Sequence, residues 1–377
     1  MDPVWLALPG CFVWLIVAAL PWRPWSTRER LDAGHGPAAD VPDLSAVTVL
    51  IPAREERSYV ARTLKSVAAQ GPVHRIVLVD DQSTDGTAEA ALACGLDKLL
   101  LVPGSTLPAG WTGKMWALEQ GRKFVDTPAV LLLDADIELR AGTLDALLSK
   151  MRTEDLALVS LMARLRMRNF WEKLLMPAFI YFFKLLYPFR LSNSESRLVA
   201  AAAGGCILMR SDVLKQLGGF DAVRNEIIDD CALARRVKAA GLRTWLGLTH
   251  SAVSQRHYEE LRSIWDMVAR TAYAQLRYSP VRLTACSFLM ALVFVVPLTV
   301  LFLGDAMANA VAAPSLLLMM GTYLPTLRYY GLSPLWSAAM PLIAVLFLLM
   351  TWTSAWRHWR GTGAQWKNRA YSGATKA

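Results

Sequence analysis

The chain has 377 residues and a net charge of +9, with 54% apolar and 19% charged residues. This mixture predicts a soluble part joined to membrane segments, in one large or two ordinary domains. The basic residues crowd near apolar segments, which favours attraction to anionic membrane lipids and argues against nucleic acid as a partner. The five cysteines show no C-x-x-C pair and no metal-ligand spacing, so neither a disulfide framework nor a zinc site is indicated.

The N-terminal residues 3–22 carry no charge and are long enough to cross a bilayer core of ~30 Å. No basic residue precedes this stretch and no small-x-small site follows it, so we expect a retained anchor rather than a cleaved signal peptide. Arg23, Arg28 and Arg30 follow it, against a single Glu29. The positive-inside rule then predicts that the chain from residue 23 onward lies in the cytoplasm.

From residue 47 to residue 133, short apolar runs alternate with stretches of helical periodicity. The expected strands are residues 47–51, 76–79, 99–102 and 130–133, and the expected helices are residues 59–70, 88–94 and 116–124. This alternation predicts a mostly parallel sheet with helices on both faces. In such sheets, ligands bind beyond the carboxyl ends of the strands.

The order of elements loosens after residue 136. Residues 169–190 are rich in aromatic side chains but are interrupted by charges and by Pro177. We therefore expect a helix that lies in the membrane interface, with an ordinary buried helix as the alternative. A strand at residues 204–209 and helices at residues 212–217 and 229–239 follow.

Three further apolar stretches, residues 283–304, 306–327 and 329–356, are each long enough to span a membrane. The tail after them is basic, without an acidic residue, and is expected to be cytoplasmic. Three full crossings would place that tail outside, so two and three crossings both stay open. Irregular backbone is expected near the Gly and Pro residues of 327–334.

Asp134-Ala135-Asp136 directly follows the last of the four expected strands. Side chains at i and i+2 of an extended segment point to the same side, so these carboxylates would repel each other without a cation between them. Mg²⁺ or Mn²⁺ carrying phosphate oxygens suits such a pair, because both ions prefer carboxylate ligands. The alternative is a solvated turn, in which Asp is common.

Two further segments close the first two strands. They are Pro52, Ala53, Arg54 and Glu55 after the first strand, and Asp80 and Asp81 after the second. Carboxylates at a strand end can accept hydrogen bonds from a nucleobase and a ribose, although the Asp-Gly pair nearby is also a plain turn signal.

Asp229 and Asp230 open the helix that is expected downstream of the Gly204-Gly205 turn. Acids in a first helical turn interact favourably with the helix dipole and need no further function. Lys114 follows a Gly-x-x-Gly loop, where it would either reach a phosphate or be a solvated lysine at a helix start.

Over about residues 45–280, the order of these motifs resembles a family 2 glycosyltransferase with the GT-A fold. That family has a nucleotide-binding Asp after the second strand, an Asp-x-Asp metal site, and a later Asp-Asp-x-x-Leu that carries the catalytic base. The matching segments are Asp80-Asp81, Asp134-Ala135-Asp136 and Asp229-Asp230-Cys231-Ala232-Leu233. Residues 110–114 and 366–371 are similar to the hopanoid-biosynthesis-associated branch, which is related to ceramide and carotenoid glucosyltransferases.

The resemblance implies a role for each residue. Asp136 and Asp134 would hold Mg²⁺ or Mn²⁺, and Asp230, beside Asp229, would deprotonate an acceptor hydroxyl. The implied nucleotide-sugar contacts are Pro52, Ala53, Arg54, Glu55, Asp80, Asp81, Lys114 and Asp134, and the implied acceptor-side residues are Gly204 and Gly205. A single base on the face opposite the leaving group implies that the acceptor displaces the nucleotide diphosphate in one step, with inversion at the anomeric carbon.

Many membrane-bound relatives carry a Gln/Arg-x-x-Arg-Trp motif after the base, and this chain has no clean copy of it. The partial candidates are residues 255–258, Arg270-Thr271 and residues 275–278. We expect Arg270 to be the counterpart. The lack of the full motif argues against a processive polysaccharide synthase.

We therefore expect an α/β domain of the GT-A type over residues 23–282, between an anchor at 1–22 and a membrane region at 283–356, with a basic tail at 357–377. The expected enzyme is an inverting, metal-dependent hexosyltransferase of a bacterial inner membrane. It would move a sugar from a nucleotide sugar, with UDP as the expected nucleotide, to a lipid hydroxyl such as that of a hopanoid. The alternatives are a polyprenyl-phosphate sugar synthase, whose acceptor needs no base, and a non-catalytic membrane scaffold.

Overall fold

The computed structural model describes residues 3–34, 43–362, 365–366 and 369–370. These residues form two compact units, each built from segments that are distant in sequence. The sheet unit comprises Glu29–Arg166, Leu191–His257 and Gln365–Ala377, and the helical unit comprises Met1–Arg28, Met167–Arg190 and Tyr258–Ala364. Lys367, Asn368 and Tyr371, which belong to the C-terminal similarity noted above, lie outside the described residues.

Within the described residues, the sheet unit contains an eight-stranded mixed sheet with the order β3-β2-β1-β4-β7-β6-β8-β5. Its strands are β1 (Val47–Ala53), β2 (Arg75–Asp80), β3 (Leu99–Pro103), β4 (Ala129–Leu133), β5 (Ile137–Leu139), β6 (Leu158–Arg164), β7 (Cys206–Arg210) and β8 (Thr244–Ser254). The first four strands are parallel to one another, and β6 is parallel to β8, whereas β7 and β5 run antiparallel to the strands beside them. The expectation of a mostly parallel α/β sheet is confirmed.

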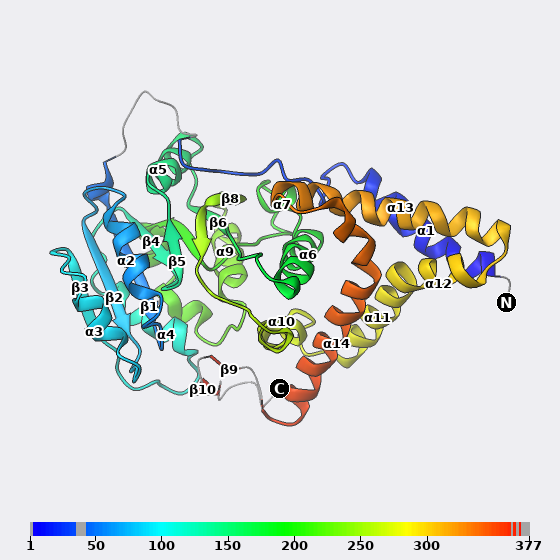
Figure 1. The fold of residues 1–377 in the computed structure, drawn as a ribbon. Helices are drawn as coiled ribbons and strands as arrows, with labels where there is room; N and C mark the ends of the chain where they lie inside the picture. The colour runs from blue at the N-terminus through cyan, green and yellow to red at the C-terminus, as the bar shows by residue number, and fades with distance from the viewer. Residues whose placement is uncertain (1–2, 35–42, 363–364, 367–368, 371–377) are drawn as a thin grey trace. The chain divides into compact units, whose positions relative to one another are not determined.

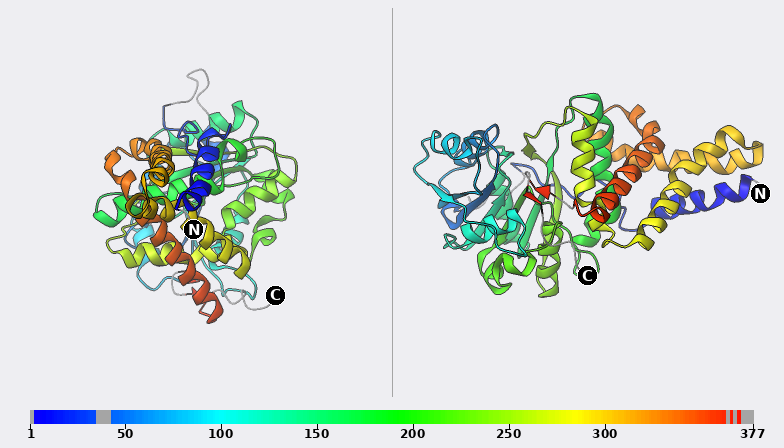
Figure 2. Two further views of the ribbon diagram at one scale, coloured as in Figure 1. Left: turned by 90° about the vertical axis from the view of Figure 1, so that its right-hand side faces the viewer. Right: turned by 90° about the horizontal axis from the view of Figure 1, so that it is seen from below.

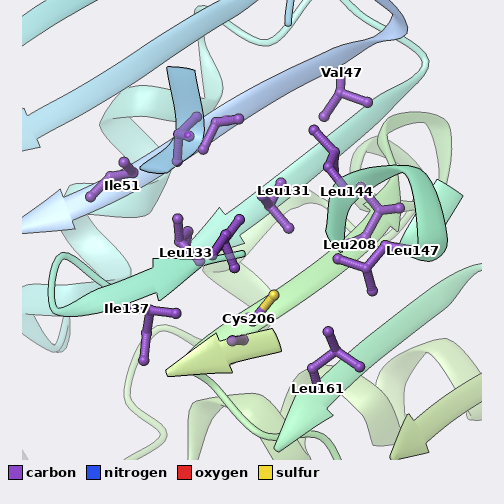
Figure 3. Close-up of a cluster of buried hydrophobic side chains, with 14 of the residues drawn as sticks. Val47, Ile51, Leu131, Leu133, Ile137, Leu144, Leu147, Leu161, Cys206 and Leu208 are labelled. Atoms are coloured by element: carbon purple, nitrogen blue, oxygen red, sulfur yellow. The ribbon is translucent and has the colours of Figure 1, made fainter. Parts of the chain in front are cut away.

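Helices cover both faces of this sheet (Figure 1 and Figure 2). One face carries α2 (Val60–Ala68), α3 (Thr87–Leu92) and α5 (Thr143–Thr153), and the other carries α4 (Gly113–Arg122), α8 (Ser211–Gln216), the 3-10 helix η2 (Gly219–Val223) and α9 (Asp229–Ala239). In the first of the two cores, Leu131 and Leu208 of the sheet pack with Leu144 and Leu147 of α5 (Figure 3). All seven residues of β1 are buried, as expected for a strand covered on both faces.

α4 begins at Gly113, three residues before the start that the apolar periodicity predicts. Thr112 is its N-cap residue, and the Thr112 backbone N–H donates to the Arg224 carbonyl at 2.7 Å. The predicted helix begins too late in the sequence because Gly113 and Lys114 do not contribute to the apolar periodicity. Lys114 therefore lies in the first turn of a helix, where backbone N–H groups favour anions.

The helical unit contains the most apolar segments. Its helices are α1 (Pro3–Ala19), α6 (Phe170–Leu186), α10 (Leu261–Gln275), α11 (Pro280–Met290), the π-helix η3 (Ala291–Val295), α12 (Val296–Leu303), α13 (Ala306–Tyr329), η4 (Pro334–Ala339) and α14 (Met340–Trp359). The short helix α7 (Phe189–Ser192) lies where the chain returns to the sheet unit, and the small strands β9 (Gln365–Trp366) and β10 (Arg369–Ala370) pair with each other. Among the residues that the structure describes, three stretches are long and apolar enough to cross a membrane: Pro280–Leu303, Ala306–Tyr329 and Pro334–Trp359.

α1 is shorter than the apolar stretch from which it was predicted. Its 17 residues extend about 26 Å at 1.5 Å per residue, slightly less than a bilayer core of ~30 Å. The break expected after residue 327 is present, since α13 ends at Tyr329 and Gly331 has a φ of +68°.

Within the helical unit, α1 packs against α12 and α13 at the π-helical turn, which the sequence did not reveal. Pro297 has no N–H to donate to the Val293 carbonyl four residues earlier. The Trp14 indole donates to that carbonyl instead, at 3.0 Å. One turn before Trp14, a Cβ added at Gly10 would lie 3.0 Å from the Leu292 carbonyl oxygen, so this glycine permits the close approach.

α6 begins with a capping box, in which Asn169 and Glu172 each accept a backbone N–H of the other. Glu172 is fully buried, and it also accepts the N–H of Tyr258 at 3.1 Å. Further along the helix, the Tyr181 hydroxyl is hydrogen-bonded to Thr322 of α13 at 2.8 Å. The position of α6 in a membrane interface stays a prediction.

Candidate active site

The carboxyl ends of the parallel strands gather the predicted donor-side residues at one edge of the sheet. Ala53 at the end of β1 pairs with Asp80 at the end of β2, which pairs with Pro103 at the end of β3. Gly104 follows, and a Cβ added there would lie 2.8 Å from the Asp80 carbonyl oxygen and 2.9 Å from the Asp81 Cα. Only a glycine allows this approach, a requirement that the sequence analysis did not identify.

The loops that follow β1 and β2 are joined by hydrogen bonds. Arg54 donates to the Asp81 carbonyl, and its Nη1 lies 3.8 Å from Oδ2 of the fully buried Asp81 side chain. Glu55 accepts the Thr84 N–H at 2.8 Å, and Asp80 accepts the Ser83 hydroxyl. The structure thus brings Arg54, Glu55, Asp80 and Asp81 into one hydrogen-bonded pair of loops.

The Gly204-Gly205 turn reaches the same edge from the opposite strand direction. β7 runs antiparallel to β4, with Cys206 opposite Leu133, so the turn that precedes β7 lies beside the end of β4. The Asp134 N–H accordingly donates to the Gly205 carbonyl at 3.1 Å. The acceptor-side glycines and the Asp-x-Asp motif are therefore neighbours.

Lys114 lies among three carboxylates that come from two parts of the chain, the end of β4 and the start of α9. Its Nζ is 2.7 Å from Asp134 Oδ1 and 3.8 Å from Asp229 Oδ2. Burial by itself would lower the pKa of Lys114, but the charges of Asp134, Asp229 and Asp230 outweigh it and raise that pKa. Lys114 is therefore a permanent cation, and three carboxylates share its one positive charge.

Asp230 is held by two backbone donors at the start of α9. Its Oδ2 accepts the Gly204 N–H and its Oδ1 accepts the Cys231 N–H, each at 2.7 Å. Burial, reinforced by the charge of Asp229, raises the pKa of Asp230 to about 6, while Lys114 and the two N–H donors oppose the rise. A carboxylate with a fixed orientation and a pKa close to neutral is suited to general base catalysis.

Asp136 lies on the other side of Asp134 and has different partners. Its Oδ2 accepts from Arg256 Nε at 2.9 Å and from the Ser254 hydroxyl at 3.2 Å. Arg256 Nη2 also donates to Glu56 Oε1 at 2.7 Å. In the sequence, Arg256 stands within a partial motif and Glu56 in the turn after the first strand, and no local pattern links either residue to Asp136.

The predicted site residues in the sheet unit come together, and one residue lies elsewhere. Pro52, Lys114, Asp134, Gly204, Asp229 and Asp230 line one small cavity whose other walls are apolar. Arg270 lies on α10 in the helical unit, so its proposed function rests on the sequence alone.

Asp134 and Asp136 are chemically suited to a divalent cation. No group of three His, Cys, Asp or Glu side chains placed for a metal occurs among the described residues. A Mg²⁺ or Mn²⁺ ion held by one or two carboxylates completes its shell with water and substrate phosphates, so two carboxylates suffice. Lys114 contacts Asp134 through Oδ1, and Arg256 contacts Asp136 through Oδ2.

Comparisons with known proteins agree with this geometry. The model of the glycosyltransferase like family 2 matches residues 42–274. A 4,4'-diaponeurosporenoate glycosyltransferase of Staphylococcus haemolyticus is 33% identical over 94 residues, which are 25% of either chain. Its counterpart in Staphylococcus aureus is 24% identical over 221 residues, which are 57% of either chain, so the chain spans about half the length of this relative.

The solved structure of the mannosyltransferase PcManGT from Pyrobaculum calidifontis, in complex with GDP-Man and Mn²⁺, has a similar fold. The TM-score is 0.56 at 18% sequence identity, over 93% of this chain and 99% of that one. This likeness supports the GT-A type of fold that the motif order predicts. Because the family model covers more than half of the chain, the chain belongs to the glycosyltransferase like family 2.

Proposed function

We propose that this protein is a membrane-bound, inverting hexosyltransferase that moves a sugar from a nucleotide sugar to a hydroxyl group of a lipid. The observation that carries the proposal is the position of Lys114 between Asp134 and Asp229. This lysine links the motif proposed to hold the metal with the acidic pair proposed to hold the base. Asp134 of the first motif and Asp230 of the acidic pair thereby line one cavity.

Asp230 is the proposed general base. The backbone donors of Gly204 and Cys231 fix both of its oxygens, and each oxygen keeps a lone pair that can accept the proton of an acceptor hydroxyl. Above about pH 6 the carboxylate is deprotonated and ready to act. The acceptor oxygen then attacks the anomeric carbon as its proton passes to Asp230, and the nucleotide diphosphate leaves on the opposite side, with inversion.

The leaving diphosphate needs positive charge. Asp134 and Asp136 would hold Mg²⁺ or Mn²⁺, which when bound supplies Lewis-acid stabilisation of the departing phosphate oxygens. Lys114, in the first turn of α4, would add its charge and the favourable helix N-terminus. The Mn²⁺ and GDP-Man in the PcManGT complex support this assignment.

The loops after β1 and β2 are the proposed nucleotide site. Asp81 is fully buried beside Arg54, so its carboxylate is held in place for a nucleobase or ribose donor. Pro52, Ala53, Glu55 and Asp80 would complete the contacts, with UDP as the expected nucleotide.

The acceptor is proposed to be a membrane lipid. Three stretches of the helical unit are long and apolar enough to cross a membrane, and the staphylococcal relatives act, by name, on 4,4'-diaponeurosporenoate. A hopanoid or related isoprenoid would suit this setting. We place the protein in a bacterial inner membrane, in contact with its lipids and with the sheet unit on the cytoplasmic side, because of the basic residues that follow α1.

The test is sugar transfer by the detergent-solubilised full chain, with Mn²⁺, a panel of UDP- and GDP-sugars, and hopanoid or carotenoid acceptors. Asp230→Asn should abolish transfer yet keep donor binding by calorimetry, whereas Asp136→Asn should weaken Mn²⁺-dependent donor binding. Asp126→Asn, at an exposed carboxylate paired with His74, is the matched control and should behave like the parent.

Three results would contradict the proposal. Transfer by Asp230→Asn to a polyprenyl phosphate, without transfer to any hydroxyl acceptor by the parent, would favour a polyprenyl-phosphate sugar synthase. Absence of binding to every nucleotide sugar would favour a membrane scaffold. Full activity of Asp136→Asn without a metal requirement would refute the metal assignment.

A further inference from the structure

We propose that Arg256 is a built-in counter-cation that competes with the divalent metal for Asp136. In this proposal the guanidinium occupies Asp136 while the donor is absent and leaves it when metal and nucleotide diphosphate arrive together. The proposal builds on the metal-dependent function proposed above. It adds a residue of this chain that couples metal loading to donor binding.

The geometry of Arg256 is that of a cation shared by two nearly buried acids. Its Nε bonds to Asp136 and its Nη2 to Glu56, at 2.9 and 2.7 Å. The Asp136 and Glu56 side chains are 11% and 7% exposed, whereas the Arg256 side chain is 28% exposed. Two nearly buried carboxylates without a cation would destabilise the fold, because their charges would be uncompensated. The guanidinium therefore supplies the positive charge that a metal would otherwise supply.

Arg256 is also placed where it can move. It follows the end of β8, in a segment that forms neither helix nor strand. Its displacement from Asp136 therefore breaks no backbone ladder. Lys114, by contrast, belongs to α4 and lies among three carboxylates, so it has no comparable freedom.

Two neighbours would guide the displaced guanidinium. The backbone of Glu56 is held by its N–H, which donates to Thr87 Oγ1 at 2.8 Å. The ring centroid of Tyr59 lies 5.6 Å from the guanidinium carbon of Arg256. Once a metal neutralises Asp136, Glu56 and the Tyr59 ring still attract the guanidinium. Its planar N–H fork then suits a diphosphate, which accepts bidentate hydrogen bonds.

The competition predicts a specific thermodynamic signature. Metal alone must displace Arg256, so its apparent affinity is its intrinsic affinity multiplied by the fraction of molecules in which Arg256 does not occupy Asp136. Nucleotide diphosphate offers the guanidinium a new partner and removes part of that cost. Metal and nucleotide therefore bind with positive coupling, which is equal in both directions.

The experiment measures Mn²⁺ binding to the solubilised full chain by calorimetry and electron paramagnetic resonance, without nucleotide and then with UDP or GDP. Arg256→Gln should bind Mn²⁺ alone on the order of tenfold more tightly than the parent, because a competing charge is lost. The same variant should show a smaller gain in Mn²⁺ affinity on adding nucleotide. Arg256→Lys keeps the charge but lacks the planar N–H fork, so its affinity for Mn²⁺ alone should lie between those of the parent and Arg256→Gln.

Arg62→Gln is the matched control. Arg62 is exposed, carries the same charge, and its Nη1 lies 3.4 Å from Oε1 of Gln255, the residue before Arg256. If Arg62→Gln gained as much Mn²⁺ affinity as Arg256→Gln, the gain would come from the loss of any nearby positive charge, and the proposal would be overturned. Unchanged or weaker Mn²⁺ binding in Arg256→Gln, in a variant that melts like the parent, would also overturn it. If the parent binds no Mn²⁺ even with nucleotide, the metal-dependent function itself fails.

Discussion

The acidic cluster at the sheet edge has two halves that neutralise their charge in different ways. In the Lys114 half, Asp134, Asp229 and Asp230 surround an ammonium that is fixed in the first turn of α4. In the Arg256 half, Asp136 and Glu56 share a guanidinium from the segment after β8. The Lys114 half has three carboxylates around a fixed cation, whereas the Arg256 half has two carboxylates around a cation that can leave.

The difference separates two requirements of glycosyl transfer. A base must keep the same orientation and pKa throughout the reaction, which suits a fixed lysine and backbone donors. A metal site must fill and empty with each donor molecule, which suits a carboxylate whose resting partner is displaceable. Asp134 and Asp136 are only two residues apart, yet they belong to different halves.

The largest expected effect concerns the base of the Lys114 half. Asp230→Asn should lower transfer to a hydroxyl acceptor by about 10³-fold, within the range that general base catalysis contributes. Folded Asp230 binds its proton more tightly than an ordinary carboxyl of pKa 3.8, so the free energy of unfolding falls as pH rises from about 4 to 6.

Asn has no proton to lose in that range, so the stability of Asp230→Asn should not fall between pH 4 and 6, while its NH₂ group, which faces one of the two backbone N–H donors, lowers stability equally at every pH. Thermal melting checks this expectation alongside the rate. An inactive variant that also melts far below the parent would mean that Asp230 is a structural residue.

A somewhat smaller effect is expected when the fixed cation is removed. Lys114→Met leaves three carboxylates without their shared charge, which should cost about 3 kcal/mol of stability and about 10²-fold in transfer rate. Loss of the ammonium also raises the pKa of Asp230 further, so the acid limb of the pH–rate profile should move to higher pH. Lys123→Met, at an exposed lysine just beyond α4, is the control and should leave both properties unchanged.

Asp229→Asn should act on Asp230 in the opposite direction. The charge of Asp229 helps to raise the pKa of Asp230 to about 6, so its removal should lower that pKa. The acid limb of kcat/KM should then move to lower pH, with less than a tenfold loss of rate on the plateau. A limb that stays in place, or moves upward, would show that the two acids do not interact as the structure implies.

Sequence patterns predicted the parts of the molecule that depend on local order. The strands before residue 134 are continuous apolar runs, and Asp134-Ala135-Asp136 follows one of them directly, so its position at a sheet edge could be inferred. Asp229 and Asp230 were likewise correctly expected in the first turn of a helix.

Contacts between distant residues could not be predicted in this way. Arg256 and Glu56 are 200 residues apart, and neither stands in a pattern that points to the other. Trp14 donates to the Val293 carbonyl, and this contact depends on the packing of helices rather than on a local signal. Lys114 illustrates the same limit, because its distance to Asp229 depends on how α4 and α9 pack on the sheet.

The smallest expected effect tests whether charge or hydrogen bonding controls the Arg256 half. Ser254 donates to the same Asp136 oxygen as Arg256, but it is neutral and its bond is 3.2 Å long. Ser254→Ala removes a bond worth about 1 kcal/mol or less, so Mn²⁺ affinity should change by less than threefold. Calorimetry on Ser254→Ala and Arg256→Gln under the same conditions measures the change in Mn²⁺ affinity for each variant. If Ser254→Ala matched the gain of Arg256→Gln, any lost donor to Asp136 would free the site, and the guanidinium charge would not be the competitor.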